Sequence, residues 1–341
     1  MHPVRKVFHK RPQEFDDFMR AMILAAGLGT RLLPLTNSRP KALTPLRNVT
    51  MLEFWVERLS RCGFDALFLN AFHLKERIGA AVCAGKWSVP VEILYEPVLL
   101  GTGGGIRSAA EYSAGAPFAV VNVDVLSDAD LGALYERHKL SGAGVSLLLH
   151  DWPEFNNVAV SRDGFVLGFG QEAKEILKKD KTARLMAFTG IHFINPSAVS
   201  GVSFGAPCDV IEVYRDLIAK NDPPAALFQQ DLFWREMGSV ESYAKLTREL
   251  GGFAPARFHP IKTGESLTIH PEARLHPSCR LGGSVVIGRD AIVCEGVSLE
   301  NVILWDCVRI EKGSSLKDCI VADGMNISGS HTGKIFAPGA V

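Results

Sequence analysis

The fold is decided by the stretch Met22-Ile-Leu-Ala-Ala-Gly-Leu-Gly-Thr-Arg-Leu-Leu-Pro-Leu-Thr-Asn-Ser-Arg-Pro-Lys41. Its apolar start, from Ala21 to Ala26, predicts a buried strand. The chain then breaks at Gly27 and Gly29. Two glycines allow backbone N–H groups to close around an anion without obstruction by side chains. The stretch therefore predicts a strand followed by a loop that binds phosphate.

Three polar side chains strengthen this interpretation. Thr30 supplies a hydroxyl donor, Arg31 a planar cation suited to phosphate oxygens, and Lys41 a second, point-like charge. The glycines fit neither the P-loop G-x-x-x-x-G-K-[ST] nor the dinucleotide pattern G-x-G-x-x-G. Gly-x-Gly alone also occurs in plain turns, so the Thr-Arg and Pro-Lys pairs are what favour phosphate binding.

The segment from Leu24 to Lys41 resembles the signature G-x-G-T-R-L-x-P-L-T-x-x-x-P-K of the sugar-1-phosphate nucleotidyltransferases, also called nucleotide-sugar pyrophosphorylases. These enzymes join a nucleoside triphosphate to a sugar-1-phosphate. The resemblance implies that the nucleoside lies over Leu24, Ala25, Ala26 and Gly27, and that the triphosphate is held by Gly29, Thr30, Arg31 and Lys41.

Composition sets the outer limits. The chain has 341 residues, which is long enough for two domains. Of these residues 47% are hydrophobic and 22% charged, as in ordinary globular proteins. Lys+Arg and Asp+Glu both number 37, which argues against a nucleic-acid or membrane partner. No apolar run reaches the length of a membrane span. Seven cysteines without C-x-x-C suit reduced thiols in the cytoplasm.

Residues 20–250 are expected to form one catalytic domain, preceded by an extension (1–19) that lacks the apolar core of a signal peptide. Strands and helices alternate along it, which predicts a Rossmann-like α/β fold: a mixed, mostly parallel sheet with helices on both faces. The predicted strands are 66–70, 91–95, 118–123 and 145–150, and the predicted helices 51–62, 74–84, 129–138 and 240–249. Ligands of such sheets bind at the carboxyl ends of the strands, where the first loop, the loop after Tyr95 and Asp124 all fall.

Gly101-Thr-Gly-Gly-Gly-Ile106 follows the predicted strand 91–95 and precedes a predicted helix. Consecutive glycines remove side chains where something must come close, although a flexible turn is the alternative. In the family the equivalent loop lies against the base, which makes Gly101, Gly104 and Glu96 candidates for contact with the base edge. The Thr-Gly-Gly-Gly-Ile form is similar to N-acetylmuramate-1-phosphate uridylyltransferases and heptose-1-phosphate guanylyltransferases.

Two carboxylates are candidate magnesium ligands. Asp124 ends an apolar strand beside the phosphate loop, although a helix-capping or turn aspartate is the alternative. Phe233-Trp-Arg-Glu-Met-Gly-Ser239 resembles the family's Trp-x-Asp-x-Gly-Thr, whose Asp is usually the second protein ligand of Mg²⁺. Here that position is Glu236, and Mg²⁺ tolerates little change in geometry.

Short β segments between Trp152 and Ile194 resemble the family's sugar-binding half. The resemblance implies that Asn157, Thr189 and Gly190 face the sugar phosphate. The family's Glu-Lys-Pro motif matches poorly at Gln171-Glu-Ala-Lys174, so Glu172 to Lys181 is interpreted as a solvated helix or loop.

A six-residue period marks the end of the chain. After a linker (251–264), apolar residues recur every six positions over 265–330, followed by a tail (331–341). Such hexads predict a parallel β-helix, and about nine of them make roughly three coils. The β-helix resembles the left-handed one appended to related pyrophosphorylases, whose role is regulation or packing into homo-oligomers. The apolar positions are Ile269, Leu275, Leu281, Ile287, Val293 and Leu299, and, after a slip of one residue, Leu304, Ile310 and Leu316.

Three functions remain open at this stage. The first is Mg²⁺-dependent transfer of a nucleoside monophosphate to a sugar-1-phosphate, in an enzyme similar to mannose-1-phosphate guanylyltransferases or N-acetylmuramate-1-phosphate uridylyltransferases. The second is a non-catalytic sensor of nucleotide sugars, which is slightly favoured by Glu236 in place of the family's Asp and by Val123 in place of its usual Gly. The third is acyl transfer with His270 or His276 as base, for which the coil is short. The residues fix neither the base nor the sugar.

Overall fold

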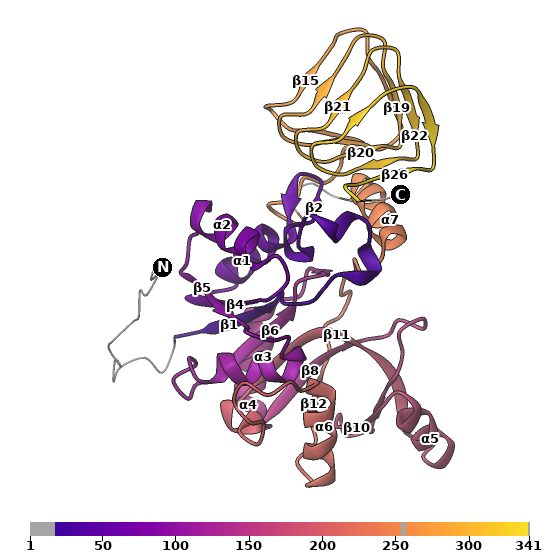
Figure 1. Ribbon diagram of the computed structural model, residues 1–341. Coiled ribbons are helices and arrows are strands. Elements are labelled where there is room, and N and C mark those ends of the chain that lie inside the picture. Colours follow the sequence, from indigo (N-terminus) through magenta and orange to yellow (C-terminus); the bar gives the residue numbers. More distant parts are fainter. Residues whose placement is uncertain (1–17, 254–256, 340–341) are drawn as a thin grey trace.

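The computed structural model describes residues 18–253 and 257–339. An α/β domain makes up most of the molecule, and a three-sided coil of strands sits on one end of it (Figure 1). Most of the predicted N-terminal extension and part of the predicted linker lie outside the described residues. No helix in the described ranges is long and apolar enough to cross a membrane.

The α/β domain is built on a nine-stranded sheet with β1 at its centre. Four strands run parallel in the order β6-β1-β4-β5, and β11 joins β6 antiparallel. The predicted mixed, mostly parallel sheet is confirmed. Its strands are β1 (Arg20–Leu24), β4 (Ala66–Ala71), β5 (Val91–Tyr95), β6 (Phe118–Asn122), β8 (Val145–His150), β9 (Val158–Val160), β10 (Val166–Phe169), β11 (Arg184–Ile194) and β12 (Ala225–Leu227).

Both faces of the sheet are buried, as the sequence of β1 requires. Ala21 and Ile23 pack into one apolar core and Met22 packs into the other. All three side chains are fully buried. The helices that cover the sheet are α1 (Met51–Arg61), α2 (Lys75–Ala84), α3 (Gly101–Ala110), α4 (Leu131–Ser141), α5 (Gln171–Lys179), α6 (Val210–Ala219) and α7 (Val240–Glu249).

Local chemistry fixes where these helices begin and end. Thr50 and Glu53 form a reciprocal capping box at the start of α1. Asp130 accepts a hydrogen bond from the N–H of Ala133 at the start of α4, and Gly142 ends that helix in the left-handed conformation. The predicted helix boundaries for 51–62 and 129–138 are correct to within three residues.

The glycine run differs from its prediction, because it is the first turn of α3 and does not precede it. Gly101 to Gly105 lie inside the helix, where the missing side chains allow a loop to pack against it. A Cβ on Gly101 would lie 2.7 Å from the carbonyl oxygen of Cys208, and one on Gly104 would lie 2.5 Å from that of Ala206. The glycines thus have a packing reason that is independent of any ligand.

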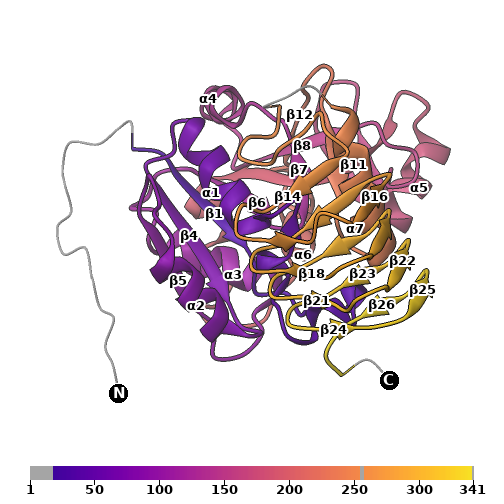
Figure 2. The ribbon, with the colours of Figure 1, turned by 90° about the horizontal axis from the view of Figure 1, so that it is seen from above.

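The C-terminal coil is a parallel β-helix with sheets of five, four and four strands, which is more than the roughly three coils expected. In the view from above, its strands lie in successive layers (Figure 2). It extends to Phe336, beyond the predicted boundary at 330. The first sheet has β14 (Leu267–Ile269), β17 (Val285–Ile287), β20 (Ile303–Leu304), β23 (Ile320–Val321) and β26 (Ile335–Phe336). The second has β15 (Arg274–Leu275), β18 (Ile292–Val293), β21 (Arg309–Ile310) and β24 (Asn326–Ile327), and the third β16 (Arg280–Gly282), β19 (Ser298–Glu300), β22 (Ser315–Lys317) and β25 (Ser330–Thr332).

The apolar hexad positions fill the inside of the coil. Ile287, Val293 and Leu299 are at most 1% exposed, whereas Ile269 in the first coil is 40% exposed because no coil precedes it among the described residues. The first sheet faces the α/β domain, and its Ile303 and Ile320 belong to that domain's core. Homo-oligomer formation through the β-helix stays a prediction.

Candidate active site

The first loop begins where β1 ends. The carbonyl of Leu24 accepts the N–H of Val123, and the N–H of Ala25 donates to Asn70 at 2.7 Å, so the loop is tied to both neighbouring strands. Gly29 has a left-handed φ of 66°, and a Cβ there would lie 3.0 Å from Thr36, whose hydroxyl donates to the Gly29 carbonyl. A glycine is therefore needed at this position.

The tip of the loop faces outward. No atom lies within 4 Å of where a Cβ on Gly27 would be, and within the described chain the N–H groups of Gly27 and Gly29 have no protein acceptor. Thr30 and Arg31 continue in a short 3-10 turn, and the Arg31 side chain is 64% exposed. The loop thus offers free N–H donors and a cation on one side, which is the arrangement that an anion requires.

A two-stranded sheet brings the predicted metal ligands together. β7 (Val125–Ser127) pairs antiparallel with β13 (Trp234–Glu236), in a register that sets Glu236 opposite Val125. The N–H of Met237 donates to the carbonyl of Asp124 at 2.8 Å. The backbones of Asp124 and Glu236, more than 100 positions apart in sequence, are therefore adjacent, and both residues line one cavity.

Each of these carboxylates is paired with one of the predicted catalytic cations. Asp124 forms an ion pair with Lys41, and both side chains are 13% exposed. Glu236 forms an ion pair with Arg31 at 2.6 Å. Two cations and two anions thus form one mixed-charge cluster at the carboxyl end of the sheet.

Asp124 and Glu236 can hold a divalent cation only when a substrate supplies further ligands. In the described parts of the chain, no cluster of three or more His, Cys, Asp or Glu side chains forms a closed metal cage. Mg²⁺ is commonly held by one or two carboxylates, with substrate phosphates and water completing its octahedron. Asp124 and Glu236 match that pattern.

Gly238 is a site residue that motif comparison alone leaves unexplained. A Cβ at this position would lie 2.3 Å from an Oε1 of Glu236 and 2.9 Å from an Nη1 of Arg31. Its φ is not in the left-handed region, so the requirement for glycine comes from the neighbouring ion pair and not from the backbone.

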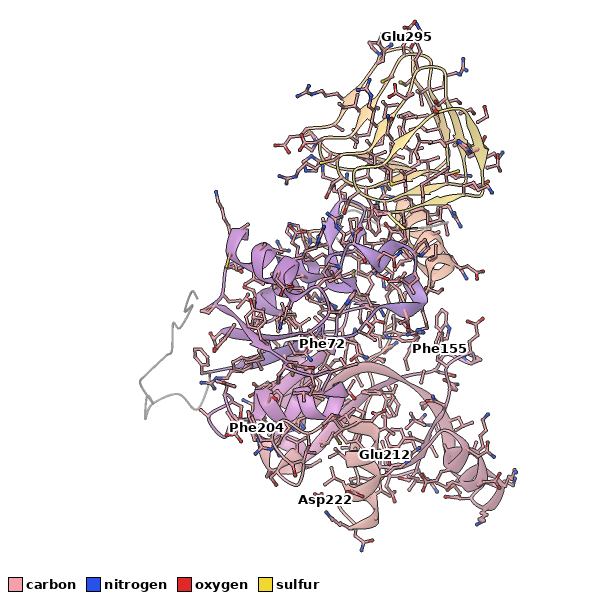
Figure 3. All side chains as sticks on the ribbon, in the orientation of Figure 1. Phe72, Phe155, Phe204, Glu212, Asp222 and Glu295 are labelled. Atoms are coloured by element: carbon pink, nitrogen blue, oxygen red, sulfur yellow. The ribbon has the colours of Figure 1, made fainter. Side chains whose placement is uncertain are left out.

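A cavity of about 390 Å³ opens beside the cluster. Its walls combine the charges of Arg31, Asp124 and Glu236 with neutral amides and several aromatic rings. Figure 3 labels Phe155, on the loop after β8, above Glu212, on α6. The remaining lining residues are Asn122, Val125, Phe155, Asn157, Val158, Phe169, Gly170, Phe188, Thr189, Gly190, Ile211, Arg215 and Trp234.

The three residues assigned to the sugar phosphate by resemblance all line this cavity. Gly190 has a φ of 76°, and a Cβ on it would lie 2.6 Å from the amide of Asn122. The hydroxyl of Thr189 is not free, because it donates to the carbonyl of Leu148, and the Thr189 carbonyl accepts the indole N–H of Trp234. Thr189 therefore shapes the wall, whereas Asn157 presents its side-chain amide.

Two polar lining residues were not predicted as site residues. Asn122 ends β6 and has no side-chain hydrogen bond to the described chain. Arg215 comes from α6, a helix that the sequence analysis did not identify, and pairs with Glu212 at 2.5 Å and Glu172 at 3.7 Å. The helical spacing of the apolar residues Val210, Val213 and Tyr214 would have indicated α6. It would also have indicated that Arg215 lies next to the apolar face of this helix.

Glu96 and the glycine run are organised for internal support. The buried Glu96 carboxylate accepts from Asn70 Nδ2 at 2.7 Å and from the N–H of Leu100 at 2.9 Å. The N–H groups of Gly103 and Gly104 both donate to the carbonyl of Cys208. Glu96 thereby joins the ends of β4 and β5 to α3, and its contact with a base stays a prediction, as does that of Gly101 and Gly104.

The comparisons with known proteins agree with this geometry. Residues 20–251 match the family described as Nucleotidyl transferase, and residues 263–332 match the GMPPB C-terminal domain. The chain belongs to the nucleotidyl transferase family. The prediction made from the first loop is thereby confirmed, and the protein is a nucleotidyltransferase with an appended β-helix.

Similar proteins carry several substrate names. The chain is 29% identical to mannose-1-phosphate guanylyltransferase of Mycobacterium tuberculosis, over 86% of this chain and 81% of that one. It is 30% identical to N-acetylmuramate alpha-1-phosphate uridylyltransferase of Neisseria meningitidis, over 65% of this chain and 94% of that one. The fold resembles the crystal structure of HddC from Yersinia pseudotuberculosis complexed with GMP-PN, with a TM-score of 0.56 and 18% identity over 68% of this chain and 99% of that one.

Proposed function

We propose that this nucleotidyltransferase transfers a nucleoside monophosphate from a nucleoside triphosphate to a sugar-1-phosphate, giving a nucleoside diphosphate sugar and pyrophosphate. The observation that carries the proposal is the mixed-charge cluster of Arg31, Lys41, Asp124 and Glu236 between an open phosphate loop and a sugar-sized cavity. The guanylyl- and uridylyltransferases among its relatives support the same reaction.

The reaction requires positioning and neutralisation of charge more than acid–base chemistry. An oxygen of the sugar phosphate attacks the α-phosphorus and forms a new P–O bond. The bond from the α-phosphorus to the bridging oxygen breaks, and its electron pair leaves with pyrophosphate. The attacking phosphate is already ionised, so no general base is needed. Arg31 and Lys41 stabilise the charge that develops on the α-phosphate and on the leaving group.

Substrate binding exchanges the partners of these cations. In the ligand-free cluster Lys41 is neutralised by Asp124, and Arg31 by Glu236. Triphosphate oxygens replace the carboxylates at the two cations, which frees Asp124 and Glu236 for Mg²⁺. These two carboxylates would hold Mg²⁺, which would supply neutralisation of phosphate charge.

The cavity is suited to the sugar phosphate. Asn122 and Asn157 offer amide groups to hydroxyls, and the rings of Phe155 and Trp234, which meet edge to face at 5.3 Å, offer an apolar face to the sugar ring. Arg215 supplies a second cation away from the triphosphate loop. The seven cysteines are all unpaired, which supports a cytoplasmic setting for the reaction.

The test is release of pyrophosphate with Mg²⁺, crossing GTP, UTP, dTTP, ATP and CTP with mannose-, glucose-, heptose- and N-acetylmuramate-1-phosphates. Release confined to particular pairs, and abolished in Asp124→Ala, would support the proposal and identify the substrates. Binding of nucleotide or nucleotide sugar by calorimetry, without release from any pair, would instead indicate a non-catalytic sensor.

A further inference from the structure

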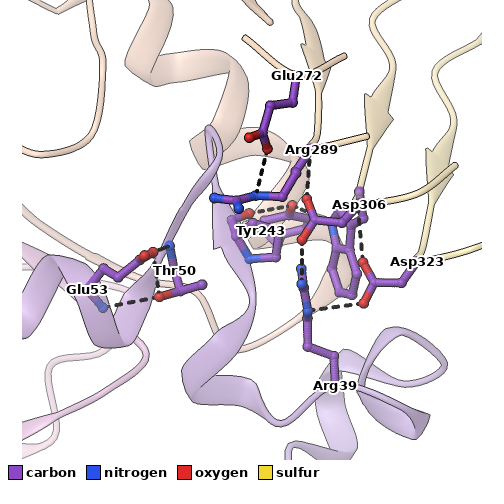
Figure 4. Close-up of polar contacts among 10 residues, drawn as sticks. Arg39, Thr50, Glu53, Tyr243, Glu272, Arg289, Asp306 and Asp323 are labelled. Atoms are coloured by element: carbon purple, nitrogen blue, oxygen red, sulfur yellow. Dashed lines mark hydrogen bonds and ion pairs between the residues drawn. The ribbon is translucent and has the colours of Figure 1, made fainter. Parts of the chain in front are cut away.

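Arg39, two residues before Lys41 in the signature segment, forms ion pairs with the β-helix. The Nη2 of Arg39 lies 2.6 Å from an Oδ2 of Asp306, and its Nε lies 3.1 Å from an Oδ2 of Asp323 (Figure 4). The Arg39 side chain is 15% exposed. A guanidinium shared by two carboxylates in a largely buried position is held in both direction and distance.

Hydrogen bonds within the β-helix orient the carboxylates of Asp306 and Asp323. Asp306 and Asp323 occupy equivalent positions 17 residues apart on successive coils, and the N–H of Asp306 donates to an Oδ1 of Asp323 at 3.1 Å. The N–H of Arg289, one coil earlier, donates to an Oδ1 of Asp306 at 2.9 Å. Burial raises the pKa of Asp323, and the charge of Arg39 opposes that rise. Backbone N–H groups of the β-helix therefore orient both carboxylates that accept from Arg39.

A second tie lies on the other side of Lys41. The indole N–H of Trp305, next to Asp306 on the β-helix, donates to the hydroxyl of Tyr243 at 2.9 Å. That hydroxyl donates to the carbonyl of Pro45 at 2.7 Å. Trp305 and Tyr243 are fully buried, and the guanidinium of Arg39 lies 5.4 Å from the centre of the Trp305 ring.

Lys41 therefore lies in a short turn that is fastened at both ends. The turn from Lys41 to Leu43 is closed by the N–H of Leu43 donating to Pro40 and by that of Thr44 donating to Lys41. The side chain of Lys41 forms an ion pair with Asp124. Because only Pro40 lies between Arg39 and Lys41, a shift of the Arg39 anchor moves the ammonium group of Lys41 relative to the triphosphate.

We propose that the β-helix is a structural support of the active site, and that Arg39 is the positioning residue through which it acts. Asp306 and Asp323 hold Arg39, and Arg39 holds the turn that aims Lys41 at the substrate. This inference rests on the proposed transfer of a nucleoside monophosphate for its kinetic consequence. The alternative is that Arg39 only joins the two domains.

A second contact between the two domains, made by Asn48, distinguishes a positioning role of Arg39 from a role in joining the domains. Asn48 donates to the carbonyl of Ile287 on the β-helix at 2.8 Å, outside the turn of Lys41. Asn48 has a φ of 67°, so Asn48→Gly removes this bond without straining the backbone. Arg39→Met removes the charge of the positioning residue, Arg39→Lys keeps it, and Asp306→Asn weakens its acceptor.

The full-length variants are compared by steady-state kinetics below their melting temperatures and by hydrogen–deuterium exchange over residues 37–44. In Arg39→Met we expect kcat to fall by about tenfold to a hundredfold and exchange at Leu43 and Thr44 to rise. Arg39→Lys should recover part of kcat. Asp306→Asn should lower kcat in the wild type and add little in the Arg39→Met background. Asn48→Gly should leave kcat and exchange unchanged.

Unchanged exchange over residues 37–44 in Arg39→Met would overturn the proposal, and so would an equal loss of kcat in Asn48→Gly. Faster exchange with an unchanged kcat would also overturn it, because Arg39 would then hold the turn without serving the chemistry. If the wild type releases no pyrophosphate from any substrate pair, the proposed function fails, while the exchange measurement still decides whether Arg39 holds the turn.

Discussion

The guanidinium of Arg31 and the carboxylate of Glu236 meet at 2.6 Å although 205 residues separate them in the chain. The pairing of β7 with β13 positions Glu236, and the turn after the first loop positions Arg31. In the proposed function, their contact joins a residue assigned to the triphosphate to a residue assigned to the metal. It also allows a choice of substitutions that alter one side at a time.

Gly238→Ala should damage this contact without unfolding the protein. The three atoms nearest to the new Cβ all belong to the ends of two flexible side chains, Glu236 and Arg31. We expect kcat/KM to fall by about tenfold or more, because the rate of a reaction falls steeply when a charged group in the active site is displaced. The melting temperature should change by no more than about 2 °C.

Gly201→Ala is the control for that substitution, since nothing lies within 4 Å of its added Cβ and its φ is not left-handed. It should leave both kcat/KM and melting temperature unchanged. Full activity in Gly238→Ala would mean that the Arg31–Glu236 contact is dispensable.

Glu236→Gln should weaken the binding of Mg²⁺ more than Glu236→Asp does. Gln keeps the shape but loses the charge that Mg²⁺ prefers, whereas Asp keeps the charge and matches the residue found at this position of the family motif. We expect the Mg²⁺ concentration for half-maximal activity to rise by at least about tenfold in Glu236→Gln. The measurement is a Mg²⁺ titration at saturating substrates.

In Glu236→Asp we expect retained activity and a change in half-maximal Mg²⁺ smaller than that of the glutamine variant. Equal Mg²⁺ dependence in the wild type and Glu236→Gln would remove Glu236 from the metal site and leave it as the partner of Arg31 alone.

Much of the fold could be predicted because its determinants are local. The apolar run of β1, the capping box at Thr50 and Glu53, and the hexads that bury Ile287 each follow from neighbouring residues. The pairing of Glu236 with Val125 could not be predicted in this way, since three-residue strands have too little sequence to specify a distant partner. The motif resemblance named Glu236 but gave no register.

The same limit applies to the functional residues. Lys41 and Arg31 belong to one continuous motif, whereas Arg215 and Asn122 reach the cavity from α6 and β6, which only the tertiary fold brings together. The glycine run of α3 shows the opposite error. Its composition suggested an open loop, but packing against Ala206 and Cys208 makes it helical.

Arg215→Ala should raise KM for the sugar-1-phosphate and leave KM for the nucleotide near its wild-type value. Arg215 lines the cavity, and its present partners, Glu212 and Glu172, have exposed side chains that a phosphate can displace. A charge-assisted hydrogen bond to phosphate is worth about 1.5–3 kcal/mol, which predicts an increase of about tenfold to a hundredfold in KM.

Lys178→Ala is its control, because Lys178 forms a similar ion pair with Glu175 on the exposed face of α5 and does not line the cavity. Steady-state kinetics with each substrate varied in turn distinguishes the two. An increase in nucleotide KM as large as that for the sugar phosphate would argue against a sugar-phosphate role for Arg215.

Acid should destabilise the catalytic domain through two buried histidines. Burial lowers the pKa of His138 to about 4 and that of His192 to about 3. Each has one partnered ring nitrogen: His138 Nδ1 lies 2.8 Å from the hydroxyl of Ser146, and His192 Nδ1 contacts that of Tyr214. Within the described chain, the other ring nitrogen of each is buried without a partner.

The lowered pKa values of the two histidines determine how the free energy of unfolding changes with pH. Below pH 6.5 the unfolded chain takes up protons at both histidines while the folded protein keeps them neutral, so the free energy of unfolding falls with pH until the folded pKa is reached. From pH 7 to pH 5 the loss should be about 2 kcal/mol for each histidine. Urea unfolding at the two pH values measures it. His138→Asn should remove about half of the pH dependence, while His276→Asn, at an exposed histidine, should remove none; an undiminished slope in His138→Asn would show that His138 is not one of its sources.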